Sequence, residues 1–405
     1  MKKSVIGLGL LLLAGLIYLV MHWGNIQRLL LVKNFLDPVK VVTNFAQAGE
    51  AFHKRELKVS APLHEWENNP RPLPEKINLL GQTITPQSYM EDTDSVALLV
   101  IKDGKILFED YYKGAEPEDH RISWSVAKSF LSSLIGAAID RGEIKSVDDT
   151  METYAPALKG TVYEGVAIKD VLRMSSGVRF SEDYFDSNSD VVKMTNILAI
   201  KGSLDEFTTR YKERDFQPGE FIRYVSIDTH AIGMVLSGAT GQTPSENFEK
   251  VLGSQLGFSQ GIHYITDSHG GEYVLGGLNM SARDYALFGQ LFLQEGKWKG
   301  QDIISKDWVH ESTSRADIPR ADGGPLGYGY QWWRPVLRDG ALYQDDFYAA
   351  GFYGQFIYVN PKANMVIVKL SVFKDSSETD ENGLPHGVRA TEFFRELTAH
   401  YADQN

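Results

Sequence analysis

The stretch Ser125-Val126-Ala127-Lys128 is the most informative part of this chain, because it places a nucleophile and a proton acceptor three residues apart. A serine hydroxyl attacks a carbonyl only if a neighbouring group takes its proton as the new bond forms. Positions three apart on an α-helix share a face, so the Lys128 amine would lie beside the Ser125 hydroxyl. We therefore expect a helix to begin here and to carry an acyl-transfer site.

An apolar run follows the lysine and predicts that this helix is buried. Its members are Phe130, Leu131, Leu134, Ile135, Ala137, Ala138 and Ile139. Arg141-Gly142 then has the cation and the glycine that are typical of a helix end. Burial lowers the pKa of a lysine, which makes a neutral amine available as a base. A helix N-terminus at Ser125 would also direct free N–H groups toward developing negative charge.

The four-residue pattern has a structural alternative, in which Ser125 caps a helix and Lys128 reaches toward solvent. The chain also repeats the pattern at Ser371-Val372-Phe373-Lys374, inside a run that is typical of a strand. Alternating strand geometry would place that serine and that lysine on opposite faces. The second copy is therefore not expected to be a site.

A third motif, Tyr224-Val225-Ser226, follows Pro218-Gly219 about a hundred residues after the serine. Together with Ser125 and Lys128 it resembles the serine β-lactamase and penicillin-binding superfamily, in its class C-like branch of esterases, carboxypeptidases and aminohexanoate-oligomer amidases. Later segments resemble further landmarks of that family in the same order, namely residues 140–144, 154–156, 168–177, 276–284 and 351–355. The resemblance covers roughly residues 80–400.

The resemblance implies a role for each matching residue. Ser125 would be the acylated nucleophile, Lys128 its base and Tyr224 a proton relay to the leaving group and from the deacylating water. A phenol can act near neutral pH only if a nearby cation stabilises its phenolate, which the lysine would provide. The backbone N–H groups of Ser125 and Phe352 would form the oxyanion hole. The alternative for Tyr224 is an ordinary core or rim tyrosine.

Two departures from the family narrow the expected chemistry. Ser226 stands where β-lactamases and transpeptidases have an asparagine, and the tyrosine motif of the aminohexanoate-dimer hydrolase group also ends in serine. Residues 349–351 read Ala-Ala-Gly where those enzymes carry a Lys-Thr-Gly that holds a substrate carboxylate. We therefore expect cleavage of small esters or amides. The alternatives are a D-Ala-D-Ala carboxypeptidase or β-lactamase, and a catalytically silent envelope binding protein.

Aromatic residues are the candidates for the substrate wall. Tyr184, Trp332 and Tyr353, with Phe185 and Trp333, would suit an apolar acyl chain or a slender amide. Ser226 and Gly351 are the other residues expected to contact substrate. The alternative is that most of these rings pack in the core.

The segment Gly257-Phe258-Ser259-Gln260-Gly261 satisfies the nucleophile-elbow pattern of α/β-hydrolases. That elbow needs a buried strand before the serine and a helix after it. Here a helix end and turn come before it, and strand-like residues 262–265 come after it. Ser125 is therefore preferred, and substitution of each serine separates the two hypotheses.

Composition limits the possible partners and cofactors. The net charge of −12 argues against a nucleic-acid partner, because phosphate binding needs a basic face. The chain has no cysteine, and its ten histidines lack the spacing of a zinc motif. No phosphate-binding or dinucleotide-binding motif occurs, so no cofactor is expected, and the expected partner is a small-molecule ester or amide substrate.

The N-terminus predicts a membrane helix. Lys2 and Lys3 precede an almost uninterrupted apolar run over residues 5–23, close to the ~20 residues that span a bilayer. No small-x-small cleavage site follows the run. We expect a retained single-pass anchor over residues 1–24 and a periplasmic or otherwise extracytoplasmic catalytic domain. The alternative is a secreted protein whose signal is cleaved.

The expected fold is α+β and class C β-lactamase-like. After a lead-in and Pro-rich tether over residues 25–78, one hydrolase domain spans residues 79–405. A Lys-Asp-Gly-Lys turn at residues 102–105 predicts a hairpin, and strands are expected again from about residue 327. These strands predict an antiparallel sheet lobe from residues 79–145 and 320–405. A mainly helical lobe over residues 146–319 is inserted between them, with the site where the lobes meet.

Overall fold

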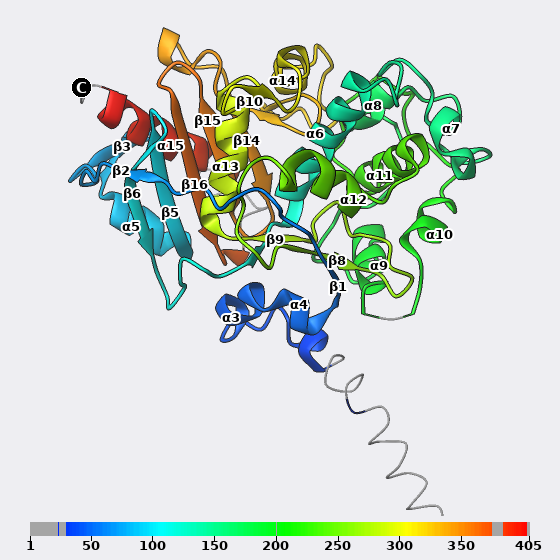
Figure 1. Cartoon of the computed structure of the whole chain (residues 1–405), viewed down its shortest axis with the longest axis horizontal. Coiled ribbons are helices and arrows are strands. Elements are labelled where there is room, and N and C mark those ends of the chain that lie inside the picture. Colours follow the sequence, from blue (N-terminus) through cyan, green and yellow to red (C-terminus); the bar gives the residue numbers. More distant parts are fainter. Residues whose placement is uncertain (1–22, 24–29, 200, 375–383, 403–405) are drawn as a thin grey trace, which may run out of the picture.

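An eight-stranded sheet forms one lobe of the protein in the computed structural model, which describes residues 23, 30–199, 201–374 and 384–402 (Figure 1). The strand order is β12-β13-β14-β15-β16-β5-β6-β2. The bounds are β2 Glu67–Asn68, β5 Ser95–Lys102, β6 Lys105–Tyr111, β12 Gly327–Tyr328, β13 Trp333–Arg334, β14 Phe347–Gly351, β15 Gln355–Asn360 and β16 Met365–Ser371. Neighbours pair antiparallel except β2, which lies parallel to β6. Both ends of the chain therefore build one sheet, as the sequence predicts.

The predicted hairpin is present between β5 and β6. Asp103 and Gly104 both have positive φ, at 52° and 74°, which is the backbone geometry of the tight turns that join twisted antiparallel strands. Side chains of β5 alternate between two cores, because successive strand residues point to opposite faces. Leu99 and Ile101 join the larger core, whereas Leu98 and Val100 join the smaller one.

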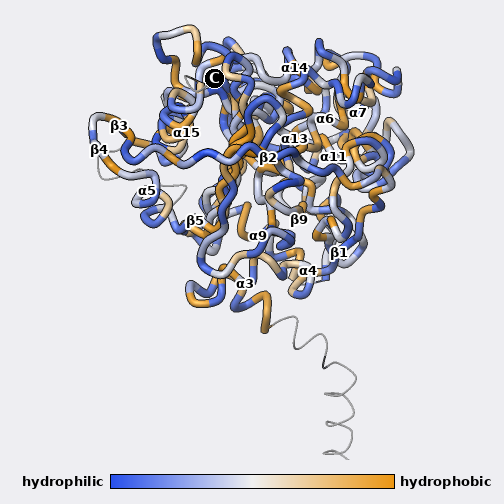
Figure 2. Tube along the Cα trace, turned by 60° about the vertical axis from the view of Figure 1, so that its left-hand side comes forward, coloured by the Kyte–Doolittle hydropathy of each residue, from blue (hydrophilic) through white to orange (hydrophobic). Residues whose placement is uncertain are grey.

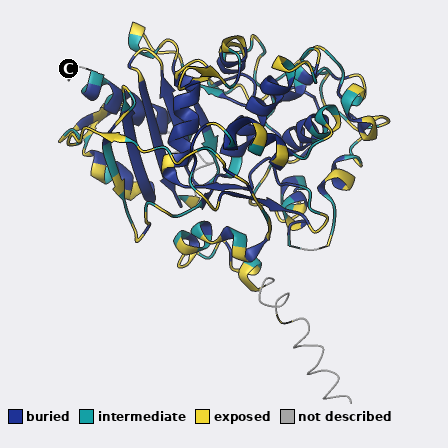
Figure 3. Ribbon diagram, in the orientation of Figure 1, coloured by how far each residue is buried: buried dark blue, intermediate teal, exposed yellow. Residues whose placement is uncertain are grey.

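Helices cover both faces of this sheet. Helix α13 (Ala282–Leu293) packs on one face against β15 and β16, while α5 (Pro86–Asp92) and α15 (His386–Ala402) cover the other. In Figure 2 the tube near the β5 label is predominantly hydrophobic, and in Figure 3 the central strands and α13 are buried. The apolar strands are thus enclosed between two helical layers.

The helical lobe lies beside the sheet and is organised around α6 (Ala127–Asp140) and α11 (Ser226–Thr240) (Figure 1). Its other helices are α7 Met151–Tyr154, α8 Ile168–Leu172, α9 Asp190–Asn196, α10 Leu204–Thr208, α12 Pro244–Phe248 and α14 Lys306–Thr313. The bounds of the helical lobe differ from the expected residues 146–319. Helix α6 lies in the range expected for the sheet lobe, residues 79–145, but packs against α11 in the helical lobe. Helix α13 falls within residues 146–319 but packs on the sheet, because most of its buried residues are apolar.

The segment before residue 79, expected to be a tether, is largely part of the folded domain. Helices α3 (Val41–Ala46) and α4 (Ala48–Ala51) precede strand β1 (His53–Glu56). Strand β1 begins a second antiparallel sheet of order β1-β8-β9-β7, with β8 His263–Thr266, β9 Leu278–Met280 and β7 Arg121–Ile122. Two small hairpins pair β3 Ile77–Leu79 with β4 Gln82–Ile84, and β10 Lys297–Trp298 with β11 Gln301–Asp302.

Within the part of the chain that the structure describes, no helix is both long enough and apolar enough to cross a bilayer. The predicted anchor over residues 1–24 lies outside the described residues except for Trp23.

Candidate active site

Ser125 lies in a 3-10 turn over Trp124–Val126 that leads directly into α6. Helical spacing then places Lys128 under the serine, with Nζ 2.8 Å from Ser125 Oγ. The apolar residues of α6 face the core, so the lysine side chain is carried into the interior and is 1 % exposed. The pairing expected from the sequence is therefore present.

Two other oxygens fix the orientation of the Lys128 amine. Nζ donates to the carbonyl of Leu275 at 2.9 Å and to Ser226 Oγ at 3.1 Å. A neutral amine has two N–H bonds and one lone pair. With both N–H bonds donated to these acceptors, the lone pair is left for the hydroxyl of Ser125.

Burial supports the neutral form of this lysine. Desolvation lowers the pKa of Lys128 to about 7, and the nearby Glu182 carboxylate opposes part of that decrease. A substantial fraction of the amine is thus unprotonated near neutral pH. This is the condition that a lysine must meet to accept a proton from serine.

Tyr224 lines the same cavity as Ser125 and hydrogen-bonds the Ser125 side chain. Its ring stacks on Trp333 at 5.4 Å, and Lys128 Nζ lies 5.1 Å from the ring centroid. Burial raises the pKa of Tyr224 above its ordinary value. This shift favours the neutral phenol and opposes the phenolate that the lysine was expected to stabilise.

Strand β14 ends at Gly351 against the backbone that precedes the nucleophile. A Cβ at Gly351 would lie 2.4 Å from the carbonyl oxygen of Ser123 and 3.1 Å from the backbone nitrogen of Ser125. Only glycine permits this approach, which brings the chain just before Phe352 next to the Ser125 N–H. The two predicted oxyanion donors are therefore in adjacent segments.

A cavity of about 540 Å³ opens over Ser125. Tyr184, Phe185, Trp333, Gly351 and Phe352 line it, together with Tyr224. The rings of Tyr184 and Phe352 stack at 4.7 Å, so much of the wall is aromatic, as the sequence predicts.

Three residues predicted to contact substrate lie elsewhere. Ser226, the first residue of α11, is buried beneath the lysine. Trp332 is fully buried among Phe288, Phe292 and Phe347, and it is the following residue that reaches the cavity. Tyr353 packs behind the site on Phe45 and Trp124. Alternation along the chain explains the Trp332 error, because neighbouring residues there face opposite sides.

Glu182 is a residue that the sequence analysis missed. It accepts from the backbone N–H of Ser226 at 2.8 Å, from Ser226 Oγ, and from the Tyr184 hydroxyl at 2.7 Å. Because Ser226 Oγ donates to Glu182, its lone pairs remain free to accept from Lys128. A lone glutamate in an irregular segment carries no spacing signal that would have identified it.

Arg320 is a second missed residue of the cavity wall. Its guanidinium lies 5.3 Å from the Trp333 ring and pairs with Asp322 at 2.8 Å through Nε. Its Nη1 is buried without a hydrogen-bond partner. A cation is therefore present in the cavity although residues 349–351 supply none, and the carboxylate of Asp322 balances its charge.

Ser259 occupies a different environment. Its hydroxyl donates to Asp284 at 2.6 Å and lies 3.1 Å from His120 Nε2. Asp284 also takes part in the N-terminal capping box of α13 with Ser281. The recorded hydrogen bonds of its carboxylate go to the two serines, Ser259 and Ser281, and not to the His120 imidazole. A π-helical turn over Glu249–Gly253 precedes this loop and β8 follows it. The strand and helix of a nucleophile elbow are absent from these described flanking segments.

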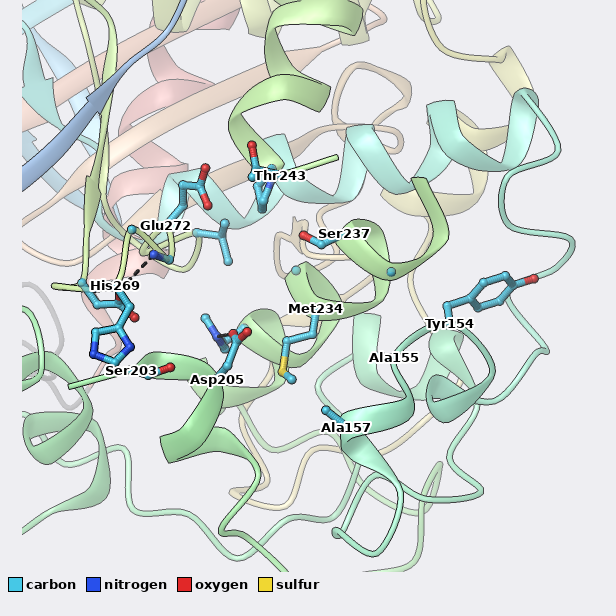
Figure 4. A pocket seen from close by; sticks show the side chains of 18 of the residues that line it. Tyr154, Ala155, Ala157, Ser203, Asp205, Met234, Ser237, Thr243, His269 and Glu272 are labelled. Atoms are coloured by element: carbon cyan, nitrogen blue, oxygen red, sulfur yellow. Dashed lines mark hydrogen bonds and ion pairs between the residues drawn. The ribbon is translucent and has the colours of Figure 1, made fainter. Parts of the chain in front are cut away.

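A second cavity of about 500 Å³ lies in the helical lobe (Figure 4). Its charged groups pair with one another, Arg55 with Glu272 at 3.1 Å and His230 Nε2 with Asp205 at 2.7 Å. Ser125 and Lys128 are not among its lining residues. Across the described residues, no group of three or more His, Cys, Asp or Glu side chains is arranged to hold a metal ion.

Several known proteins are similar to this chain in sequence or in fold. A 6-aminohexanoate-dimer hydrolase from Paenarthrobacter ureafaciens is 29 % identical over 316 residues, covering 75 % of this chain and 79 % of that protein. The structure of a Bacillus anthracis protein proposed to be a 6-aminohexanoate-dimer hydrolase superposes with a TM-score of 0.80 at 22 % identity, covering 91 % of this chain and 96 % of that one. A class C β-lactamase superposes with a TM-score of 0.57 at 15 % identity over 77 % and 94 % of the two chains. The β-lactamase family matches residues 81–385, and the chain thus belongs to this family as a serine hydrolase of the β-lactamase and penicillin-binding superfamily.

Proposed function

We propose that this enzyme cleaves esters or amides of small substrates through an acyl intermediate on Ser125. The observation that carries the proposal is the geometry of the Lys128 amine. Its two N–H bonds are directed to Leu275 O and Ser226 Oγ, which leaves its lone pair for the serine hydroxyl 2.8 Å away. A pKa of about 7 makes this neutral form accessible at physiological pH.

The reaction proceeds in two proton-balanced stages. Ser125 Oγ attacks the substrate carbonyl while its proton passes to Lys128, and the backbone N–H groups of Ser125 and Phe352 stabilise the oxyanion. The neutral Tyr224 hydroxyl donates a proton to the leaving group as the ester or amide bond breaks, and the Lys128 ammonium returns a proton to it. Water then attacks the acyl-enzyme by the same route in reverse, which releases the acid and restores Ser125.

The aromatic wall formed by Tyr184, Phe352 and Trp333 favours slender, largely apolar acyl or amide chains. The activity of the Paenarthrobacter relative makes short linear amides, including the 6-aminohexanoate dimer, the first candidates. Arg320 places a cation in the cavity, which would suit the terminal carboxylate of such a linear amide. The same cation would suit the carboxylate of a β-lactam, which is the second candidate.

The test of the nucleophile uses two serine variants and a fluorophosphonate probe read by intact mass. We expect one covalent adduct on the wild type and on Ser259→Ala, and none on Ser125→Ala. Turnover of p-nitrophenyl esters should follow the same order. Retained turnover in Ser125→Ala with loss in Ser259→Ala would refute the proposal. An unlabelled wild type beside a labelled control enzyme would instead support the silent binding protein.

Substrate class is tested by comparing nitrocefin, p-nitrophenyl esters of varied chain length and short linear amides. We expect ester or amide turnover to exceed nitrocefin turnover. Hydrolysis of nitrocefin faster than that of the esters and amides would support the β-lactamase alternative instead.

We also propose that residues 1–24 anchor the protein in a membrane, with the catalytic domain on the extracytoplasmic side. The described residues just after the apolar run support this, because Leu30, Leu31, Leu36 and Val39 are 55, 43, 48 and 89 % exposed. Apolar side chains next to an anchor are suited to the bilayer interface. The full chain should remain with the membrane fraction after a carbonate wash, whereas recovery of a shortened soluble protein would indicate signal cleavage.

A further inference from the structure

Two aromatic residues flank the proposed oxyanion donors. Trp124 directly precedes Ser125, and Tyr353 directly follows Phe352. Their rings stack with centroids 6.1 Å apart and an interplanar angle of 21°. The segments that carry the two N–H groups are therefore joined by a contact behind the cavity.

Both flanking residues have a left-handed backbone. The φ angles are 46° for Trp124 and 61° for Tyr353. This conformation is unfavourable for bulky residues and persists only where the surrounding structure holds it. The Ser125 N–H belongs to the peptide that joins Trp124 to Ser125, and Tyr353 lies one residue beyond the peptide that carries the Phe352 N–H.

Phe352 contacts both rings from the cavity side, and a second side chain that contacts both comes from the N-terminal segment. Phe45 of α3 meets Tyr353 edge-on at 5.0 Å and Trp124 at 5.6 Å, and it is 2 % exposed. Phe35 adds a contact with Trp124 at 6.4 Å. These phenylalanines lie outside residues 81–385, the region that matches the family.

Helix α3 is also fixed to the domain by a partly buried hydrogen bond. Arg121 donates to the carbonyl of Val42 at 3.0 Å, and its side chain is held in turn by Asp119 at 2.8 Å. Arg121 belongs to β7, three residues before Trp124. The helix that carries Phe45 is thus attached to the same segment that leads into the nucleophile.

We propose that Phe45 is a positioning residue for the oxyanion hole, acting through Trp124 and Tyr353. The inference rests on the proposed function, because it assigns the N–H groups of Ser125 and Phe352 to the reaction. Loss of the ring lets the two left-handed residues relax and moves both donors. Since an oxyanion hole acts on the transition state, kcat should fall while KM changes little.

The test compares Phe45→Leu with Phe393→Leu in the full chain. Phe393 is a matched control, because it is also fully buried and stacks on a tyrosine, Tyr89, but belongs to the other core. The readouts are kcat and KM for a p-nitrophenyl ester and the inhibition constant of an alkyl boronic acid. The boronic acid forms a tetrahedral adduct on serine and so reports on the oxyanion site.

We expect Phe45→Leu to lower kcat and boronate affinity about tenfold or more, with KM within about twofold of the wild type. Phe393→Leu should lower the thermal midpoint but leave all three constants within about twofold. Unchanged kcat and boronate affinity in a folded Phe45→Leu, or equal losses in both variants, would overturn the inference. If Phe45→Leu does not fold, Phe45→Met, which keeps more of the volume, is judged by the same readouts. An active Ser125→Ala would instead refute the proposed function itself.

Discussion

Replacing Glu182 with glutamine should shift the pH dependence of acylation toward acid. Ser226 Oγ bridges the two groups, accepting from Lys128 Nζ at 3.1 Å and donating to Glu182. Unit charges about 5 Å apart at an effective dielectric constant of about 20 interact by about 3 kcal/mol. Since about 1.4 kcal/mol equals one pKa unit, loss of the Glu182 charge can lower the pKa of Lys128 by roughly two units at most. Screening by water in the cavity reduces the expected shift to about one unit.

The sign follows from which form of the lysine reacts. Only the neutral amine of Lys128 accepts the serine proton, so kcat/KM of the wild type should rise with pH through about 7 and then level off. The Glu182 carboxylate stabilises the ammonium form. Its removal lowers the lysine pKa further, so the variant should reach its plateau at lower pH.

The assay is the pH profile of kcat/KM for a p-nitrophenyl ester, which reports on the free enzyme. Glutamine keeps one acceptor oxygen for the hydroxyls of Ser226 and Tyr184, but its NH2 group cannot accept from the Ser226 N–H. The readout is therefore the position of the acid limb, which follows the charge on Lys128, and not the plateau rate. Asp183→Asn is the control, because Asp183 lines the same cavity but its recorded hydrogen bonds go to the N–H groups of Phe185 and Asp186. An acid limb that stays in place in Glu182→Gln, or that shifts equally in Asp183→Asn, would refute the electrostatic coupling.

Three other predictions use single substitutions. Tyr224→Phe should lower kcat by about 10²-fold or more, because it removes the proton relay but keeps the ring that stacks on Trp333. The control Tyr328→Phe, which alters a buried neighbouring ring, should retain activity. Steady-state kinetics of both variants test this, and equal activities would contradict the proton relay. Gly351→Ala should lower the rate of fluorophosphonate labelling about tenfold or more, because the added Cβ would lie 2.4 Å from Ser123 O. An unchanged rate would show that β14 can move away from Ser123 without loss of reactivity at Ser125. Lys369→Met should raise the thermal midpoint at pH 7, because burial lowers the pKa of Lys369 from 10.5 to about 7. Between these two pH values the unfolded chain binds more protons than the folded one, so the stability of the wild type rises with pH across that window. Calorimetry at pH 7 and 9 should show a smaller rise in the variant, and a lower midpoint at both pH values would refute this account.

The turn that carries Ser125 and much of the sheet could be predicted from sequence because their signals are local. Ser125 and Lys128 meet through the spacing of one helix, and the Asp103-Gly104 turn needs only its own backbone preferences. Strands β15 and β16 are apolar runs in the region beyond about residue 327, where strands were expected. Each of these features depends on contacts within a few residues of the chain.

The incorrect predictions concern residues whose role depends on the direction in which the side chain points. Trp332 and Trp333 are adjacent, and only the fold decides which ring enters the core and which reaches the cavity. Tyr353 was expected at the substrate, yet its left-handed backbone turns the ring toward Phe45. Glu182 and Arg320 had no motif, since their partners lie on distant segments.

The sequence by itself determined that a serine and a lysine share one turn of a buried helix, because helical periodicity is a property of neighbouring residues. Tertiary structure alone decided the state of that lysine. Leu275, Ser226 and Glu182 come from distant parts of the chain to occupy its N–H bonds and set its charge environment. The same holds for Phe45, which reaches Trp124 and Tyr353 only after the N-terminal segment packs on the domain. Desolvation and hydrogen-bond direction depend on everything that surrounds an atom, and short-range sequence patterns do not contain that information.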